Sequence, residues 1–227
     1  MRFAALHPCS FIDWPGRLAA VAFTSGCNLR CRYCHNPALA CGTAATPVEE
    51  EAVLAHLRAR RGRLDGLVVT GGEPVIHAGL AAFLAAVKRE GFAVKLDTNG
   101  TRPDVVGELL GAGLVDYLAV DLKAPPRCGG WLTGDAGQGE AARRCLELAL
   151  SAGVEHEVRT TLVAPAHDAA QLAAMAEVAR GARRWAFQRF RPGHHLDATA
   201  PLVPPGPELV AAARAAARSC GIEPVFR

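Results

Sequence analysis

The sequence predicts a single α/β domain over residues 1–227, in which six strand–helix units form a partial (βα)6 TIM-like barrel. Three observations lead to this fold class. Short apolar runs alternate with segments of helical spacing, half of the 227 residues are hydrophobic, and polar motifs follow the ends of the apolar runs. A chain of this length can bury one large core, and alternating strands and helices form parallel sheets through right-handed crossovers.

The expected strands are six short apolar runs rich in valine and leucine. Runs of this length and composition are typical of strands that are buried on both faces of a parallel sheet. In chain order they cover residues 18–26, 65–74, 92–100, 115–123, 154–163 and 183–190. Six units are too few for a closed eight-stranded barrel, so we expect the barrel to stay partly open.

The expected helices lie between and after these runs, where apolar residues recur at helical spacing. Several of the segments end in glycine, as helices commonly do. They cover residues 48–61, 78–91, 103–113, 139–153, 168–181 and 207–221. Two long irregular stretches, 124–138 and 191–207, remain, and long loops of this kind often cover a functional site.

Charge and hydropathy exclude several classes of function. The 25 Lys and Arg residues and 22 Asp and Glu residues are scattered, without a basic run or interleaved aromatic residues. This pattern argues against nucleic-acid binding as the main activity. Neither an export signal nor an apolar run long enough to span a membrane is present in the sequence. We therefore expect a cytoplasmic protein with neither nucleic-acid nor membrane partners.

Three of the eight cysteines, Cys27, Cys31 and Cys34, cluster in the segment CNLRCRYCHNP. In a chain of this size without an export signal, such clustering favours metal ligation over disulfides. A zinc-binding interaction module is the alternative from a different class of function. Zinc would require a fourth ligand, and the nearest candidate, His35, is adjacent to Cys34, which makes joint ligation of one tetrahedral ion awkward.

Each of the other polar motifs also follows a predicted strand. GGEP occupies residues 71–74, DTNG occupies 97–100 and DLK occupies 121–123, whereas the cysteine motif follows the first strand. The carboxyl ends of parallel strands meet at the same edge of a sheet or barrel, and ligands bind at that edge. We therefore expect all four motifs to surround one site.

Together these motifs resemble the radical S-adenosylmethionine superfamily. Five segments, FIDWPGRLAAVAFTSGCNLRCRYCHNP, VVTGGEP, VKLDTNG, VDYLAVDLKAP and EVRTTLV, are similar to the activating enzymes of glycyl-radical proteins. The order and the residues of these segments are most similar to those of the anaerobic ribonucleoside-triphosphate reductase activating proteins, and the pyruvate formate-lyase activating enzymes are close relatives. The resemblance spans about residues 8 to 190 and implies a radical S-adenosylmethionine core fold.

The resemblance implies that Cys27, Cys31 and Cys34 bind a 4Fe-4S cluster whose fourth iron is left for S-adenosylmethionine. Electron transfer from the reduced cluster would give a 5′-deoxyadenosyl radical, which installs a glycyl radical on a partner enzyme. The implied partners are an anaerobic ribonucleoside-triphosphate reductase and an electron donor such as flavodoxin or ferredoxin. The alternatives are a pyruvate formate-lyase type of activase and a small-molecule enzyme such as 7-carboxy-7-deazaguanine synthase.

For S-adenosylmethionine, the resemblance implies contacts on both sides of the cluster. Tyr33 is expected beside the adenine. Gly71 and Gly72 lack a Cβ atom and would allow close backbone approach, and Glu73 would accept hydrogen bonds from the methionine ammonium. Arg159 is expected to reach the carboxylate or the ribose, although an ion pair with Glu157 or Asp168 would be its ordinary alternative.

The strand-end motifs complete the expected site. Asp97, Thr98 and Asp121 are expected by resemblance to surround a monovalent cation, and Lys123 to contact the polar end of the cofactor. A compact ammonium is not replaceable by a guanidinium in such a role. Asn99 is assigned with Asp97 and Thr98 to the cofactor site. All three have a purely structural alternative, because Asp and Asn-Gly are common formers of turns.

Overall fold

The computed structural model describes residues 1–43 and 47–227, and within these ranges nine strands form one sheet in the order β3-β1-β2-β4-β5-β6-β7-β8-β9. The six predicted strands are all present, and each pairs with the next in parallel. They are β2 (Ala19–Thr24), β4 (Gly66–Gly71), β5 (Ala93–Thr98), β6 (Tyr117–Asp121), β7 (Glu155–Leu162) and β8 (Trp185–Arg189). The parallel partial barrel is therefore confirmed.

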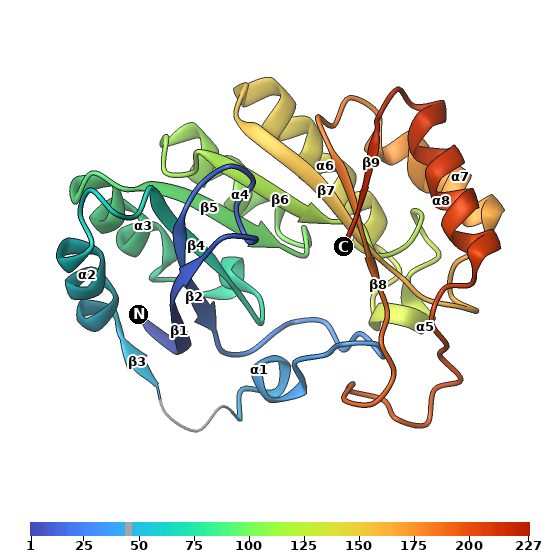
Figure 1. Ribbon diagram of the computed structural model, residues 1–227, viewed down its shortest axis with the longest axis horizontal. Helices are drawn as coiled ribbons and strands as arrows, with labels where there is room; N and C mark the ends of the chain where they lie inside the picture. Colours follow the sequence, from blue (N-terminus) through green and yellow to red (C-terminus); the bar gives the residue numbers. More distant parts are fainter. Residues whose placement is uncertain (44–46) are drawn as a thin grey trace.

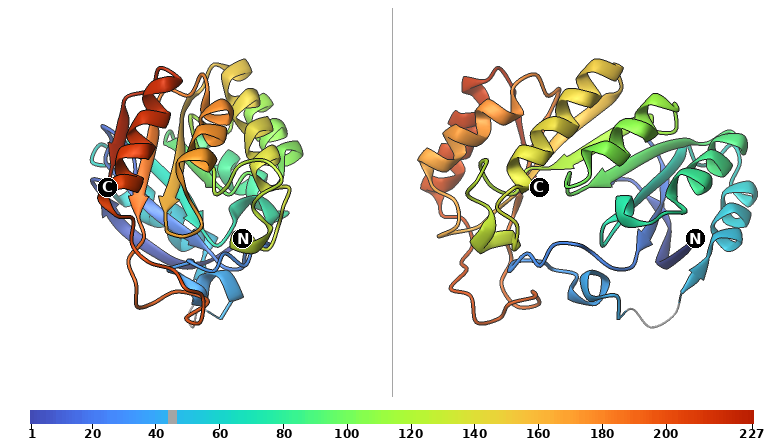
Figure 2. Two further views of the ribbon diagram at one scale, coloured as in Figure 1. Left: turned by 90° about the vertical axis from the view of Figure 1, so that its right-hand side faces the viewer. Right: turned by 180° about the vertical axis from the view of Figure 1, so that it is seen from behind.

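The sheet curves into an arc, and the helices lie along its outer side (Figure 1). All six predicted helices are found within one to two residues of the expected limits. They are α2 (Glu50–Ala59), α3 (Leu80–Arg89), α4 (Pro103–Gly111), α6 (Gln138–Ala152), α7 (Ala169–Ala179) and α8 (Pro207–Ser219). Figure 2 shows the same arrangement from behind, with the arc open between its two ends. In the described ranges, no helix combines the length and apolar character needed to cross a membrane.

Three further strands extend the sheet beyond the prediction. β1 (Arg2–Ser10) pairs antiparallel with β2 and with the two-residue β3 (Val48–Glu49), and β9 (Pro224–Phe226) pairs parallel with β8. The prediction missed them because they lie near the edges of the sheet, where side chains alternate between buried and exposed and proline is tolerated. Three short helices were also missed: α1 (Pro37–Cys41), the 3₁₀ helix η1 (Pro74–Ile76) and α5 (Gly130–Thr133).

The main core lies between the sheet and the outer helices and includes Phe83, Leu96 and Leu172. A second apolar group fills the inner side of the sheet and includes Trp14 and Tyr117. Because β1 is antiparallel to β2, the loop that carries Trp14 lies at the amino-terminal edge of the parallel strands. The interior is thus filled with apolar side chains at one end, which leaves the carboxyl-terminal end for polar groups.

Candidate active site

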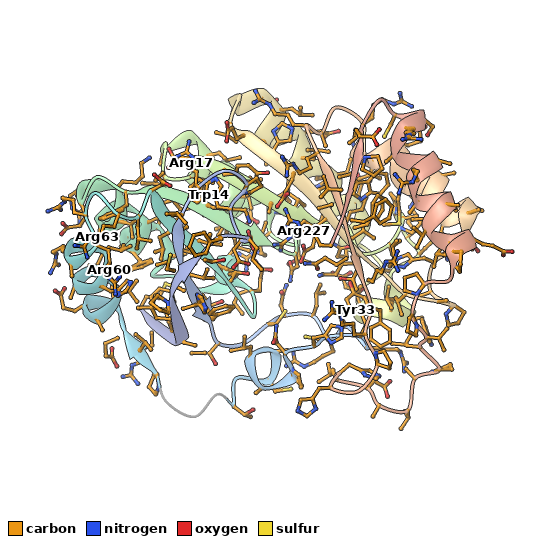
Figure 3. All side chains as sticks on the ribbon, in the orientation of Figure 1. Trp14, Arg17, Tyr33, Arg60, Arg63 and Arg227 are labelled. Atoms are coloured by element: carbon orange, nitrogen blue, oxygen red, sulfur yellow. The ribbon has the colours of Figure 1, made fainter. Side chains whose placement is uncertain are left out.

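The four predicted motifs meet around a cavity of about 510 Å³ at the carboxyl ends of the parallel strands. Every residue that the sequence assigned to the site lines this cavity. These residues are Cys27, Cys31, Tyr33, Cys34, Gly71, Gly72, Glu73, Asp97, Thr98, Asn99, Asp121, Lys123 and Arg159. In Figure 3, Tyr33 lies on the side of the molecule that carries the cysteine loop, whereas Trp14 lies toward the opposite end of the strands. The predicted convergence is confirmed.

The cysteine loop is held in place by the first of the two long irregular stretches. The backbone N–H of Arg30 donates to the carbonyl of Thr133 at 3.0 Å, and that of Arg32 donates to Leu132 at 2.9 Å. The guanidinium of Arg32 also donates to the carbonyl of Trp131 at 2.7 Å. Helix α5 and the residues on either side of it therefore hold the backbone of the loop that carries the three thiols.

The second long stretch covers the loop from the other side. The N–H of Leu196 donates to the carbonyl of Cys34 at 3.0 Å, and the carboxylate of Asp197 forms an ion pair with Arg32. Phe190, which precedes this stretch, packs in a small apolar cluster with Tyr33 and Cys31. Both stretches thus cover the site, as their length had suggested.

Two of the three thiols, Cys27 and Cys31, resist ionisation in the absence of a bound cation. Burial raises the pKa of Cys31 to about 11 and also raises the pKa of Cys27, so each thiolate needs a bound cation to stabilise it. All eight cysteines are free. In the described part of the chain, no three His, Cys, Asp or Glu side chains converge on one point as a single zinc ion requires. That Cys27, Cys31 and Cys34 together hold a 4Fe-4S cluster stays a prediction, and thiolates are the usual ligands of such clusters.

Gly71 and Gly72 place the end of β4 against the start of the cysteine loop. A Cβ atom on Gly72 would lie 2.0 Å from the carbonyl oxygen of Gly26, and one on Gly71 would lie 2.3 Å from the backbone nitrogen of Thr24. The N–H of Glu73 donates to the Gly26 carbonyl at 2.8 Å. The two glycines are therefore required by backbone contact within the protein, and their contact with S-adenosylmethionine stays a prediction.

Glu73 connects the GGEP and DTNG motifs. Its side chain is buried; one carboxylate oxygen accepts from the Thr98 hydroxyl at 2.7 Å and from the Val75 N–H at 3.3 Å. The other oxygen accepts from the Asn99 N–H at 2.6 Å. Burial raises the pKa of Glu73 to about 7, although these hydrogen bonds oppose the rise. The carboxylate is thus held in a fixed position at the cavity wall and is poised to gain a proton or a cationic partner.

Asn99 forms the turn that was the structural alternative and also contacts the cysteine loop, whereas its contact with the cofactor stays a prediction. Its side-chain oxygen accepts from the N–H of Thr101 at 3.0 Å, which is the local bond expected of a turn-forming asparagine. Its amide nitrogen also donates to the Asn28 side chain at 2.9 Å and to the sulfur of Cys27 at 3.8 Å. Asn99 therefore links its turn to the cysteine loop.

Arg159 bridges the two aspartates of the site. Its guanidinium donates to Asp97 at 2.6 Å and to Asp121 at 2.8 Å, and the ammonium of Lys123 lies 3.0 Å from the second oxygen of Asp121. The alternative of an ion pair with Glu157 or Asp168 is replaced by these contacts. Burial favours the neutral acids, but the charges of Arg159 and Lys123 hold the pKa of Asp121 at about 2. The Arg159 and Lys95 charges likewise hold the pKa of Asp97 below its usual range.

Two residues of this network were missed by the sequence analysis. The ammonium of Lys95 contacts Asp97, and the side-chain nitrogen of Gln138 donates to the carbonyls of Asn99 at 2.7 Å and Asp121 at 2.6 Å. The sequence contained a signal for Lys95, because it lies two positions before Asp97 in an apolar strand and side chains at that spacing lie on the same face of the strand. The sequence contained no such signal for Gln138, because it lies where an irregular stretch becomes a helix.

The residues assigned to a monovalent cation do not fit one in this arrangement. Each carboxylate oxygen of Asp97 and Asp121 already contacts a lysine or arginine side chain. The hydroxyl of Thr98 donates to Glu73. An added cation would have to share these oxygens with the lysine and arginine side chains and would be repelled by their charges.

The chain is similar to known proteins in sequence and in fold. Residues 21–179 match the model of the radical SAM superfamily. A Methanocaldococcus jannaschii protein assigned as a glycyl-radical enzyme activating enzyme is 32% identical over 195 residues, with 83% of this chain and 79% of that protein covered. A crystal structure of a radical SAM methyltransferase from Sphaerobacter thermophilus superposes with a TM-score of 0.70 at 20% identity, covering 96% of this chain and 68% of that one.

Two shorter matches concern activases with named partners. The pyruvate formate-lyase 1-activating enzyme of Escherichia coli K12 is 32% identical over 130 residues, which cover 54% of this chain and 52% of that enzyme. The anaerobic ribonucleoside-triphosphate reductase-activating protein of Vibrio cholerae is 32% identical over 92 residues, covering 39% of this chain and 59% of that protein. From the superfamily match and the extended match to the Methanocaldococcus protein, this chain belongs to the radical S-adenosylmethionine superfamily and, within it, to the glycyl-radical enzyme activating enzymes.

Proposed function

We propose that this chain activates an anaerobic ribonucleoside-triphosphate reductase by removing the α-hydrogen of one of its glycines. The observation that carries the proposal is the convergence of the cysteine loop and the three strand-end motifs on one cavity. The Vibrio cholerae match supports the choice of partner. A backbone glycine is a suitable substrate, because without a side chain it can enter a narrow site and adopt unusual dihedral angles.

The residues of the chain divide the work of this reaction. Cys27, Cys31 and Cys34 would hold the 4Fe-4S cluster, which when bound supplies the electron that cleaves S-adenosylmethionine to the 5′-deoxyadenosyl radical. Lys123 and Arg159 present positive charge toward the cavity, which suits the carboxylate of the cofactor. Lys123 also lies 5.9 Å from the ring centroid of Tyr33, which we propose flanks the adenine.

Two further assignments complete the proposal. The electron would come from a flavodoxin or ferredoxin, since reduction of a low-potential cluster requires a donor of that class. We also propose a cytoplasmic location, because free thiols that bind iron must stay reduced and cytosolic redox systems maintain them in that state.

The second candidate function is activation of pyruvate formate-lyase, which the Escherichia coli match favours. A small-molecule radical enzyme, such as one of the 7-carboxy-7-deazaguanine synthase type, is the remaining alternative. The three candidates differ in the acceptor of the radical, and the acceptor can be measured directly.

The test is anaerobic electron paramagnetic resonance on reconstituted protein with reductant, S-adenosylmethionine and the host's anaerobic ribonucleotide reductase. A glycyl-radical doublet on the reductase, with 5′-deoxyadenosine in the same tube, is the expected result. A doublet only with pyruvate formate-lyase would replace the partner. Deoxyadenosine without either doublet would contradict activation of both enzymes and direct the search to small molecules.

A second prediction concerns the proposed contact between Glu73 and the methionine ammonium. Replacing Glu73 by alanine should weaken S-adenosylmethionine binding by about tenfold to a hundredfold, the range expected when a hydrogen bond to a charged group is lost. Calorimetric titration of the cluster-loaded protein measures the effect, and iron content should stay at the wild-type level. Glu208→Ala, at an exposed position on α8, is the matched control. Unchanged affinity for S-adenosylmethionine in Glu73→Ala would show that Glu73 stabilises the DTNG turn and does not bind the methionine ammonium.

A further inference from the structure

We propose that the ammonium of Lys95 takes the place of a monovalent metal cation beside the S-adenosylmethionine site, so that this chain orders Asp97 without a bound alkali ion. Lys95 lies on β5 two residues before Asp97, and alternate residues of a strand share one face. Its side chain is only 1% exposed, and its ammonium contacts one carboxylate oxygen of Asp97. The inference rests on the proposed cofactor site and is independent of the identity of the partner enzyme.

The first argument is that protein cations already occupy the oxygen atoms that a metal ion would need. Hard cations take oxygen ligands, with carboxylates foremost. Besides its contact with Lys95, Asp97 accepts from Arg159 at 2.6 Å. Asp121 accepts from Arg159 at 2.8 Å and from Lys123 at 3.0 Å. A metal ion bound by these two carboxylates would have to share each oxygen with a lysine or arginine side chain, whose positive charge would repel it.

The second argument is the balance of charge inside the barrel. Among the side chains that form ion pairs on β5, β6 and its flank, and β7, three acidic groups face three basic ones, with Arg227 at the margin, 3.5 Å from an oxygen of Glu157. Glu73 lies outside these ion pairs, at the cavity wall, and its buried carboxylate has a raised pKa. Uncompensated charge is expensive in a protein interior, so an additional metal cation would be disfavoured while all three basic groups stay in place. The acidic side chains are Asp97, Asp121 and Glu157, and the basic ones are Lys95, Lys123 and Arg159.

The third argument is that three neighbouring strands fix the position of this ammonium. It contacts Asp97 on β5, lies 3.8 Å from an oxygen of the fully buried Glu157 on β7, and lies 5.6 Å from the ring centroid of Tyr117 on β6. A charge held in this way can order the Asp97 carboxylate as a bound metal ion would. Asp97 in turn orders Arg159, which lines the cavity, so Lys95 is a positioning residue.

The test begins with the cluster-loaded wild-type protein at constant ionic strength. Affinity for S-adenosylmethionine and formation of 5′-deoxyadenosine should be the same in potassium, sodium and choline chloride, because choline is too large to enter a site for an alkali ion. The melting temperature of the protein should likewise be the same in the three salts. A saturable increase in affinity with potassium or sodium would overturn the proposal.

The variant Lys95→Met removes the ammonium while keeping most of the side-chain volume. In choline chloride it should bind S-adenosylmethionine about tenfold to a hundredfold more weakly, the range typical of groups that orient the residues of a site. Potassium or sodium should restore affinity and raise the melting temperature in a saturable manner. The matched control is Lys88→Met, which breaks a more exposed ion pair with Asp116 and should show no response to the cation.

Each outcome decides one question. Wild-type affinity in Lys95→Met without any response to cations would show that Lys95 does not replace a metal ion. If Lys95→Met folds only in potassium or sodium chloride, its folding depends on an alkali ion, and this result also supports the proposal. If Lys95→Met folds in none of the three salts, the comparison of the wild-type protein in the three salts tests the proposal by itself. Failure of the wild-type protein to bind S-adenosylmethionine at all would instead contradict the proposed function.

Discussion

Replacing Gly72 by alanine is expected to abolish the iron–sulfur cluster. The added Cβ atom would lie 2.0 Å from the carbonyl oxygen of Gly26 and 2.6 Å from its carbon. Both neighbours are backbone atoms, so relief requires the chain before Cys27 to move, which costs about 1–3 kcal/mol or more for an overpacked site. Displacement of Cys27 would remove one cluster ligand. Iron and sulfide content after anaerobic reconstitution measures the effect.

A matched glycine is available as the control for this prediction. A Cβ atom on Gly111, the last residue of α4, would meet no atom within 4 Å among those described, so Gly111→Ala should bind the cluster like the wild type. Both substitutions add one methyl group, which isolates the contact with Gly26. Full cluster content and wild-type affinity for S-adenosylmethionine in Gly72→Ala would show that the end of β4 can separate from the cysteine loop without loss.

The motifs at the strand ends could be predicted because their position follows from the order of elements alone. Once the apolar runs around 65–74, 92–100 and 115–123 are assigned as parallel strands, GGEP, DTNG and DLK must lie at one edge of the sheet. The predicted site residues of these three motifs are thereby placed at the cavity without knowledge of any distance, whereas Tyr33 and Arg159 were assigned from the family resemblance. The six central strands and the location of the site are therefore set by the local pattern.

The contacts among these residues could not be predicted, because they depend on how far each strand is shifted relative to the next. Arg159 is opposite Asp121 in the register of β6 and β7, and this register decides that it pairs with Asp121 and Asp97 rather than with Glu157. The close approach of Gly72 to Gly26 depends in the same way on how the two loops pack. The monovalent cation was expected from the family resemblance, and the contact of Lys95 with Asp97, which the spacing of the two residues on one strand allows, was not considered.

Replacing Arg159 by methionine is expected to be the most destabilising change in the site. Its guanidinium contacts Asp97 and Asp121, and its removal would leave two carboxylates short of positive charge inside the barrel. Removing one partner of a buried ion pair typically costs about 3–5 kcal/mol. Chemical denaturation of the apoprotein measures the loss. The control is Arg58→Met, which breaks exposed ion pairs with Glu51 and Glu90 and should lower stability far less, because solvent screens exposed pairs.

The pH dependence of this loss distinguishes electrostatics from packing. In the wild type the pKa of Asp121 is about 2 and that of Asp97 is also lowered, so their contribution to stability is present above the unfolded pKa of about 4 and is lost as pH falls through the folded values. Without Arg159, Lys95 and Lys123 would remain beside the two carboxylates, but the largest charge that opposes burial would be lost and both pKa values would rise. The folded variant would then bind more protons than the folded wild type at intermediate pH, so it would gain less stability than the wild type as pH rises. The difference between wild type and variant should therefore be larger at pH 8 than at about pH 4, whereas a loss of packing alone would give the same difference at both.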